Sequence, residues 1–233
     1  MTLDEQKKFI SDNIKRIKSE IGNRDVTLLA ATKTQSAELI NYAIDCGITH
    51  IGENRVQELL DKYDDIVKDN VTIHFIGALQ TNKVKYIVDK VSMIQSVDRI
   101  SLAEEIDKRC KAIGKVMDVL VEVNIGEEES KSGVDTNNLE NMLTEISKFR
   151  NISVKGLMFI PPIFKNINEQ TFYLEKIKSL FIDIRSKNID NICISTLSFG
   201  MSNDYIASME YGSTMIRIGS GIFGNRYYPQ KNN

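Results

Sequence analysis

The feature that most constrains this chain is a regular alternation of short apolar segments with longer amphipathic ones. Apolar segments of strand length recur eight times, at residues 26–34, 48–52, 71–77, 93–97, 116–124, 154–160, 192–197 and 214–219. The segments between them predict helices at residues 36–44, 56–67, 82–88, 100–113, 139–149, 169–186 and 204–210. Strands that are apolar on both faces and alternate with helices are typical of a parallel sheet covered by helices.

This alternation predicts an α/β fold that is a single (β/α)8 TIM barrel. A length of 233 residues suits one such barrel and leaves no room for a second domain beside it. Apolar residues recur at helical spacing from Leu3 to Ile21, so we also expect an extra N-terminal helix, ended by Gly22. The rival architecture, an open doubly wound sheet, would carry a Gly-x-Gly-x-x-Gly motif after the first strand, and the motif is absent there. We expect one barrel domain over residues 1–229 and a polar tail over residues 230–233.

The charge and hydropathy of the chain argue against two classes of partner. Lys and Arg number 30 and Asp and Glu 32, with the two signs mixed, so the chain lacks the basic surface that binding to a nucleic-acid backbone requires. The first twenty residues carry charges throughout, and no apolar run reaches the ~18 residues of a membrane span. We expect a cytoplasmic monomer with no nucleic-acid or membrane partner.

Cysteine and histidine give no sign of a metal centre. Cys46, Cys110 and Cys193 are far apart and form no C-x-x-C pair, which argues against a disulfide framework and against a thiolate zinc site. His50 and His74 lack the i, i+4 spacing of a helical metal pair, and we interpret each as a strand residue with an ordinary hydrogen bond.

A lone lysine, Lys33, stands near the end of the apolar run at residues 26–34. In α/β barrels the ligand site lies at the carboxyl ends of the strands, where apolar walls would lower the pKa of a lysine amine and make it a nucleophile toward a carbonyl group. A lysine that reaches into solvent from a strand end is the alternative. Closure of the barrel would place the first strand beside the last, and hence Lys33 near Arg217.

Two loops rich in small residues follow the seventh and eighth strands, at residues 198–204 and 219–224. In barrels these positions commonly bind phosphate through backbone N–H groups and hydroxyls. The alternatives are a plain turn at residues 219–221 and helix N-caps at Ser202 and Asn54. A lysine amine, an adjoining arginine and two phosphate-sized loops together describe a site for a small phosphorylated carbonyl compound. Pyridoxal 5′-phosphate (PLP) has the required aldehyde, ring nitrogen and phosphate.

Six stretches of the sequence resemble the pyridoxal 5′-phosphate homeostasis protein family, whose barrel is similar to the N-terminal domain of alanine racemase. They lie at residues 31–34, 51–58, 74–83, 156–158, 197–204 and 212–219, and so run through almost the whole chain in order. Two residues depart from the family pattern: Ala78, where proline is usual, and Phe199, where methionine is common. Both departures concern the shape of a loop rather than the carbonyl chemistry.

The resemblance implies a set of cofactor-binding residues, with no catalytic residue and no metal. Lys33 would carry PLP as an internal aldimine, Asn54 would lie near its ring, and Arg217 would face its ring nitrogen. The residues that would hold the phosphate are Met201, Ser202, Gly219 and Ser220. Glu53, Glu122 and Asn124 are expected either to point into the barrel mouth or to pair with neighbouring lysines.

A carrier is the first hypothesis for the function. An arginine at the ring nitrogen keeps that nitrogen unprotonated, so the ring would be a poor electron sink. Racemases with such a ring need a second base, which in the alanine racemase family comes from another domain and subunit, and we expect no such domain here. We therefore expect a carrier or buffer in PLP homeostasis that exchanges PLP with PLP-dependent apoenzymes. The alternatives are a slow PLP-dependent amino-acid racemase and a lysine-dependent, aldolase-like barrel without a cofactor.

Overall fold

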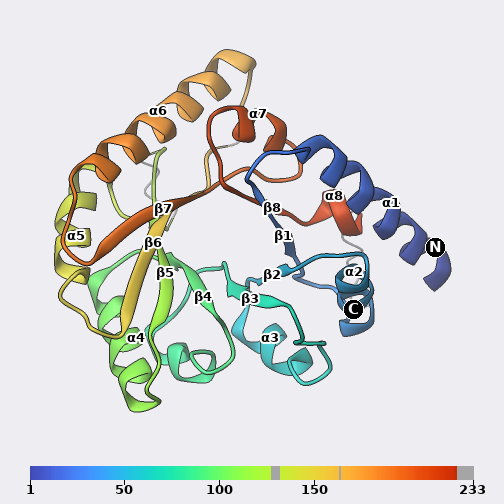
Figure 1. Ribbon diagram of the computed structural model, residues 1–233, viewed down its shortest axis with the longest axis horizontal. Coiled ribbons are helices and arrows are strands. Elements are labelled where there is room, and N and C mark those ends of the chain that lie inside the picture. Colours follow the sequence, from blue (N-terminus) through green and yellow to red (C-terminus); the bar gives the residue numbers. More distant parts are fainter. Residues whose placement is uncertain (127–131, 163, 225–233) are drawn as a thin grey trace, which may run out of the picture.

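The structure is a computed structural model that describes residues 1–126, 132–162 and 164–224. It is a closed barrel of eight parallel strands, in which each strand pairs with the next in sequence and β8 pairs with β1 (Figure 1). The strands are β1 (Thr27–Ala31), β2 (His50–Glu53), β3 (Thr72–Phe75), β4 (Met93–Val97), β5 (Met117–Val123), β6 (Ile152–Phe159), β7 (Ile192–Ser198) and β8 (Met215–Ile218). The prediction of a single TIM barrel is confirmed, whereas the predicted tail at residues 230–233 lies outside the described residues.

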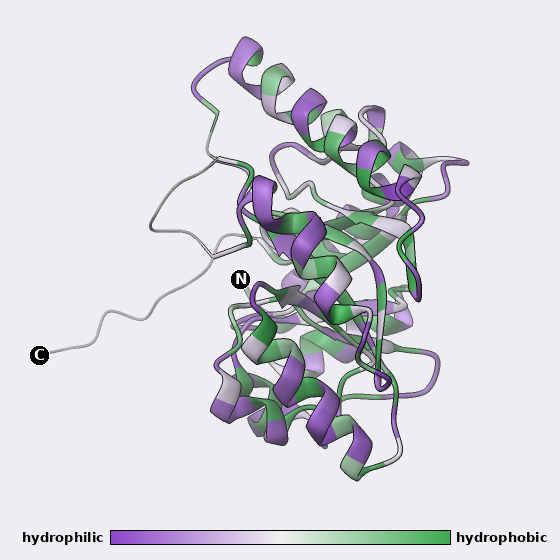
Figure 2. Ribbon diagram, turned by 90° about the vertical axis from the view of Figure 1, so that its left-hand side faces the viewer, coloured by the Kyte–Doolittle hydropathy of each residue, from purple (hydrophilic) through white to green (hydrophobic). Residues whose placement is uncertain are grey.

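Helices surround the barrel at the amphipathic segments of the sequence. They are α1 (Leu3–Ile21), α2 (Ala37–Asp45), α3 (Val56–Lys62), the 3-10 helices η1 (Thr81–Tyr86) and η2 (Thr136–Asn138), α4 (Ile100–Ala112), α5 (Leu139–Ile146), α6 (Ile167–Ser186), α7 (Tyr205–Glu210) and α8 (Ser220–Phe223). Hydrophilic and hydrophobic bands alternate along them, as expected of helices with one face on a core (Figure 2). Within the described residues, none of them is long and apolar enough to cross a membrane. The extra N-terminal helix is confirmed as α1.

Two helical segments differ from the prediction. The helix expected at residues 56–67 ends at Lys62. Beyond it, the side chain of Asn41 in α2 donates to the carbonyl oxygen of Asp65 and accepts from the N–H of Val67, both at 2.9 Å. These backbone groups are therefore paired without a helix. The loop predicted at residues 219–224 contains a short helix, α8, so the alternative of a plain turn at residues 219–221 is wrong.

The strands bury apolar side chains on their outer faces and a mixed set inside the barrel. Outward residues such as Ala30, Ile51 and Ile216 belong to the main core under the helices. A smaller, separate apolar cluster consists of Leu29, Ala31, Ile76 and Met215. A hydrogen bond joins Gln95 of β4 to Ser198 of β7, two strands that are not neighbours, so it must cross the barrel interior. The centre of this barrel is therefore partly polar.

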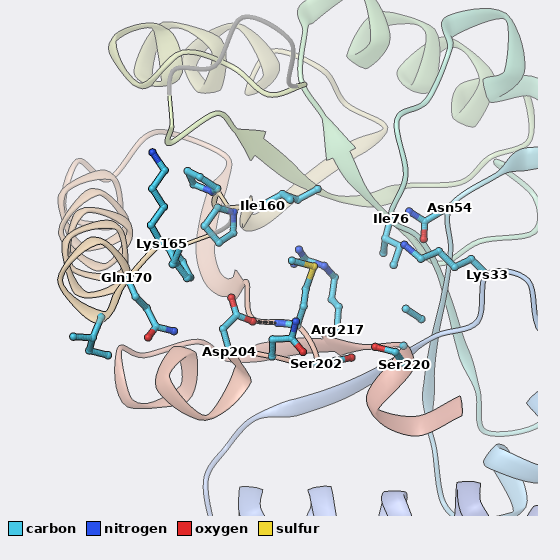
Figure 3. A pocket seen from close by; sticks show the side chains of 18 of the residues that line it. Lys33, Asn54, Ile76, Ile160, Lys165, Gln170, Ser202, Asp204, Arg217 and Ser220 are labelled. Atoms are coloured by element: carbon cyan, nitrogen blue, oxygen red, sulfur yellow. Dashed lines mark hydrogen bonds between the residues drawn. The ribbon is translucent and has the colours of Figure 1, made fainter. Parts of the chain in front are cut away.

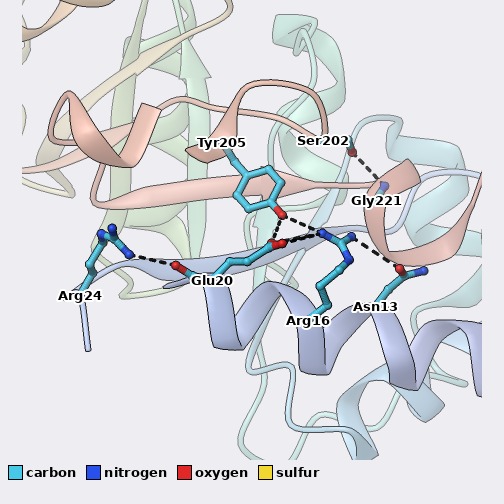
Figure 4. Close-up of polar contacts among 7 residues, drawn as sticks. All are labelled: Asn13, Arg16, Glu20, Arg24, Ser202, Tyr205 and Gly221. Atoms are coloured by element: carbon cyan, nitrogen blue, oxygen red, sulfur yellow. Dashed lines mark hydrogen bonds and ion pairs between the residues drawn. The ribbon is translucent and has the colours of Figure 1, made fainter. Parts of the chain in front are cut away.

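Helix α1 ties the beginning of the chain to its last helices. Its buried residues are Ile10, Ile14, Ile17 and Ile21. Arg16 donates to the hydroxyl of Tyr205 in α7 at 3.0 Å, and that hydroxyl donates to Glu20 (Figure 4). The side chain of Asn13 donates to the carbonyl oxygen of Ile222 in α8 at 3.3 Å. The first helix thus fixes α7, which directly follows the first predicted phosphate loop, and α8, which lies within the second.

Gly77, after β3, lies so close to the backbone of Asn54 that an added Cβ would be 2.1 Å from the Asn54 carbonyl oxygen. We expect Gly77→Ala to lower the free energy of unfolding by about 3 kcal/mol or more, because backbone cannot move aside as a flexible side chain can. Gly114→Ala is the control: its added Cβ meets nothing within 4 Å, and its φ of +66° costs about 1 kcal/mol. Urea denaturation measures both, and an equal or smaller loss at Gly77 would contradict the close approach.

Candidate functional site

A cavity of about 600 Å³ lies at the carboxyl ends of the strands (Figure 3). All seven site residues predicted from the sequence line it: Lys33, Asn54, Met201, Ser202, Arg217, Gly219 and Ser220. They come from the ends of β1, β2, β7 and β8, which form a continuous part of the wall because the barrel closes. The fold therefore gathers into one cavity residues that are far apart in the sequence.

Most of the remaining lining belongs to two walls of the cavity, one beside Lys33 and one opposite it. Ile76 lies beside Lys33, whereas Lys165 and Gln170 lie on the opposite side (Figure 3). The second wall follows β6 and is made by Ile160, Pro161, Pro162, Phe164, Lys165, Asn166, Ile167 and Gln170. Sequence reasoning missed this wall. The available signal is a proline pair, Pro161 and Pro162, directly after the strand predicted at residues 154–160.

Lys33 lies in the loop after β1, at the edge of the cavity and half-buried. The sequence predicted an amine sheltered by apolar walls, and Ala31 and Ile76 do line the cavity. Full burial is not observed, because the side chain starts beyond the end of the strand rather than inside the barrel. The side chain therefore lines the cavity and remains partly exposed to solvent.

The loop that carries this lysine is held from beneath by α3. Nζ of Lys62 donates to the carbonyl oxygens of Thr32 at 3.0 Å and of Gln35 at 3.3 Å. The N–H of Thr34, whose φ is +66°, donates to the carboxylate of Glu58 at 3.0 Å. A threonine rarely adopts this left-handed conformation, so the surrounding contacts must hold it there.

Lys62 is itself paired with a buried carboxylate, Glu53, at the end of β2. Its Nζ lies 2.7 Å from Oε1 of Glu53, and the hydroxyl of Thr32 donates to the same oxygen. Burial raises the pKa of Glu53, and the charge of Lys62 opposes that rise. Oε2 of Glu53 has no hydrogen-bond partner among the described residues. Of the two roles expected for Glu53, pairing with a lysine is confirmed.

Asn54 faces the cavity next to Lys33 (Figure 3). The alternative of a helix N-cap is wrong for this residue, because Arg55 is the residue that precedes α3 and no side chain caps that helix. Oδ1 of Asn54 is buried and has no hydrogen-bond partner within the part of the chain that the structure describes. Leaving a buried amide oxygen unpaired costs free energy, so this atom is available to a ligand that can donate a hydrogen bond.

Arg217 reaches the cavity from β8, although only 5% of its surface is exposed. Nη1 donates to the carbonyl and hydroxyl oxygens of Ser198 at 2.9 and 2.8 Å, and Nη2 donates to the carbonyl oxygen of Phe159 at 2.9 Å. Among the described residues, these bonds use three of the five N–H groups of the guanidinium and leave two. Burial lowers the pKa of Arg217 to about 10, so the group stays charged at neutral pH. Neutral oxygens hold this charge, which favours an acceptor or an anion in the cavity.

The loops after β7 and β8 meet at a hydrogen bond from the N–H of Gly221 to the hydroxyl oxygen of Ser202, at 2.9 Å (Figure 4). The N-cap alternative for Ser202 is therefore wrong, since Asp204 is the residue that precedes α7. Asp204 also accepts from the N–H of Met201 at 2.6 Å, so Met201 can offer the cavity its side chain but not its N–H. Within the described residues, the hydroxyl proton of Ser202 and the N–H of Ser220 have no protein acceptor.

Glu122 is a buried acid at the end of β5 that sequence reasoning placed either at the barrel mouth or in a lysine pair. It is not among the residues that line the cavity, and no lysine of the described residues forms an ion pair with it. Burial and the negative charge of Asp98 raise the pKa of Glu122 to about 7, and the charge of Arg217 opposes that rise. Glu122 is thus a group that titrates near neutral pH beneath the site.

The buried pair under Lys33 should matter for stability. We expect Lys62→Met to lower the free energy of unfolding by about 3–5 kcal/mol, because it leaves the carboxylate of Glu53 buried without a counter-charge. The loss should be larger at pH 8 than at pH 5, since a proton on Glu53 removes the unpaired charge. Urea denaturation at both pH values measures this. The double variant Lys62→Met/Glu53→Gln should regain part of the loss, and a double variant that regains nothing would argue against the pairing.

The raised pKa of Glu122 leads to a separate prediction about how stability depends on pH. Its raised pKa means that the folded protein binds the proton more tightly than the unfolded chain, so its contribution to stability is present below about pH 4.5 and is lost as pH rises through about 7. From this group we expect the free energy of unfolding to fall by about 1–3 kcal/mol between about pH 5 and 8. Glu122→Gln should remove that part of the slope, whereas Glu104→Gln, on the exposed face of α4, should keep it. Equal slopes in the two variants would refute the assignment.

Comparison with known proteins gives a family as well as a fold. The family model for the alanine racemase N-terminal domain matches residues 7–227. A protein of Aquifex aeolicus named pyridoxal phosphate homeostasis protein is 42% identical over 207 residues, which cover 89% of this chain and 90% of that protein. The structure of PipY from Synechococcus elongatus with PLP bound is 28% identical, has a TM-score of 0.84, and is matched over 92% of this chain and 100% of that chain.

Alanine racemase from Clostridium difficile shares the fold alone. Its TM-score is 0.78 at 15% identity, and the likeness covers 96% of this chain but only 58% of the racemase. The sequence match to the homeostasis protein, in contrast, extends over nine-tenths of both chains. The chain therefore belongs to the pyridoxal phosphate homeostasis protein family, whose barrel is the alanine racemase N-terminal domain.

Proposed function

We propose that this chain binds PLP in the cavity through a reversible imine bond to Lys33, and that it acts as a carrier and buffer in the homeostasis of this cofactor. The observation that carries the proposal is that seven residues predicted from separate parts of the sequence line one cavity of about 600 Å³. This volume suits a small ligand, since such pockets measure about 300–1,000 Å³. The family, and the relative PipY with its bound PLP, support the same ligand.

The unused hydrogen-bonding groups of the cavity fit this ligand. Arg217 has two N–H groups left, one of which would donate to the ring nitrogen. Asn54, whose buried oxygen has no partner among the described residues, would lie beside the ring. Ser202 and Ser220 would hold the phosphate with their hydroxyls and backbone N–H groups, next to Gly219. The side chain of Met201 would close this end of the cavity.

Bound PLP supplies an aldehyde that exchanges reversibly between amines. Lys33 is half-buried at the edge of the cavity, so a competing amine can approach it from solvent. In the protein without a ligand, the contacts of Lys62 and Glu58 hold the loop that carries Lys33. A fixed but accessible amine suits uptake and release of the cofactor better than permanent attachment.

The groups around the cavity favour a carrier over a racemase. Arg217 is charged at neutral pH and can only donate, so it would leave the ring nitrogen unprotonated and the ring a poor electron sink. A racemase also needs a second proton-transfer group opposite Lys33. Asp204 is the carboxyl group of the described lining, and its side chain already accepts from the N–H of Met201. We further propose a cytoplasmic monomer that passes PLP to PLP-dependent apoenzymes.

The test of binding is covalent trapping. Wild-type protein incubated with PLP should show a visible imine band, and borohydride reduction followed by peptide mass mapping should locate one modification at Lys33. Lys33→Ala should lose both the band and the adduct because it lacks the amine. Lys165→Ala is the matched control, since Lys165 also lines the cavity, and it should keep both. A folded wild-type protein with no adduct at Lys33 would overturn the proposal.

The test of the carrier role is isotopic. PLP-loaded protein incubated with an enantiopure amino acid in heavy water should pass PLP to the amine without exchanging the α-hydrogen at turnover rates. Amino-acid analysis by mass and by chiral chromatography measures both processes. Deuteration of the α-carbon together with inversion at turnover rates would show that the racemase alternative is right.

A further inference from the structure

A continuous line of hydrogen bonds crosses the inside of the barrel beneath the cavity. Nη1 of Arg217 donates to the hydroxyl oxygen of Ser198 at 2.8 Å, and that hydroxyl donates to Oε1 of Gln95 at 2.8 Å. Nε2 of Gln95 lies 3.0 Å from Nδ1 of His74, and Nε2 of His74 lies 3.0 Å from Nδ1 of His50. We call these five residues the interior network. His50 is its partly exposed end, and the other four residues are buried.

The guanidinium group sets the direction of every bond in the interior network. It can only donate, so the oxygen of Ser198 accepts and the hydroxyl proton goes to Gln95. The amide nitrogen of Gln95 then donates to His74, and it also lies 3.1 Å from the sulfur of Met215. His74 must therefore accept at Nδ1, carry its proton at Nε2 and donate to His50. Burial lowers the pKa of His74 to about 3, so this ring is neutral at physiological pH, as the pattern requires.

The direction of these hydrogen bonds matters because the groups that accept from Arg217 are neutral oxygens. The two carbonyl oxygens that it contacts, from Ser198 and Phe159, are fixed by the strands, whereas a serine hydroxyl can rotate to present either a lone pair or its proton. Gln95 takes that proton and leaves the lone pairs of Ser198 to the guanidinium. His74 opposes a reversed amide of Gln95, because the amide oxygen would then face Nδ1 and the ring would have to move its proton from Nε2 to Nδ1 and stop donating to His50.

We propose that Gln95 and His74 are positioning residues that hold Arg217 in its orientation toward the cavity, although neither of them lines it. The proposal rests on the proposed function for the identity of the ligand, while the interior network belongs to the protein without a ligand. Without Gln95, the hydroxyl of Ser198 turns freely and the guanidinium loses a fixed acceptor. Its two remaining N–H groups then point into the cavity for only part of the time.

Binding of PLP tests this coupling. Gln95→Leu removes both the oxygen and the nitrogen of the amide at similar side-chain volume. It should raise the Kd of PLP, measured from the imine absorption band, by about tenfold or more. The double variant Gln95→Leu/Arg217→Gln should bind no more weakly than Arg217→Gln alone, because Gln95 acts through Arg217. Ser96→Ala is the matched control, because Ser96 is the next residue of β4 and its buried hydroxyl has no hydrogen-bond partner in the described ranges. The affinity of this variant for PLP should stay within about twofold of the wild-type value. Additive losses, or an unchanged affinity in Gln95→Leu, would overturn the proposal.

Nuclear magnetic resonance of the ligand-free protein gives a second readout that does not depend on PLP. Imidazole nitrogen shifts should show His74 as the neutral tautomer protonated at Nε2 in the wild type and as a mixture of tautomers in Gln95→Leu. The Nε–H resonance of Arg217 should be sharp in the wild type and in Ser96→Ala, and broadened in Gln95→Leu. A wild-type His74 protonated at Nδ1, or an Arg217 resonance that is unchanged in Gln95→Leu, would refute the positioning role even if PLP binds. Gln95→Met, which is more flexible, replaces Gln95→Leu if that variant does not fold.

Discussion

The pairing of β1 with β8 is the contact on which the rest of the site depends. Leu29 is in register with Arg217, and Ala30 is in register with Ile218. Lys33 follows the first of these strands, and Arg217 lies on the second, so this ladder brings an amine and a guanidinium to one mouth. An open sheet of the same strands would leave them at opposite edges. The chemistry of the cavity therefore follows from closure of the barrel, before any detail of the loops is considered.

Two buried polar systems support the two halves of this mouth. Glu53 and Lys62 hold the loop that carries Lys33, and the interior network holds Arg217. Barrels of this type are usually filled by layers of apolar side chains, whereas this one contains a line of hydrogen bonds between strands that are not adjacent. Buried polar groups stabilise a structure only when their hydrogen-bond partners are in place. Both systems therefore restrict which side chains can replace their members, and both hold the orientation of the groups above them.

The sequence was sufficient for the architecture and for bringing seven separate residues to one cavity, because strand ends in a parallel barrel all face one way. It left Asn54 and Ser202 open between a helix N-cap and a ligand site, since the residue types that cap helices also line ligand sites and a local pattern does not separate the two uses. The wall after β6 was missed because it depends on how a loop folds back over the barrel. The spacing of His50 and His74 argued against a metal pair, but their mutual contact depends on the register of β2 and β3, which no local pattern gives.

Helix α1 also sets an order of events during synthesis on the ribosome. Residues 3–21 emerge long before residues 205–223 exist, yet α1 and the last two helices are tied together through Tyr205 and Ile222. The loops that would hold a phosphate therefore reach their final form only after translation has passed residue 223. A nascent chain therefore carries the Lys33 amine before the part of the cavity formed around α7 and α8, and under the proposed function it would bind the cofactor poorly at that stage.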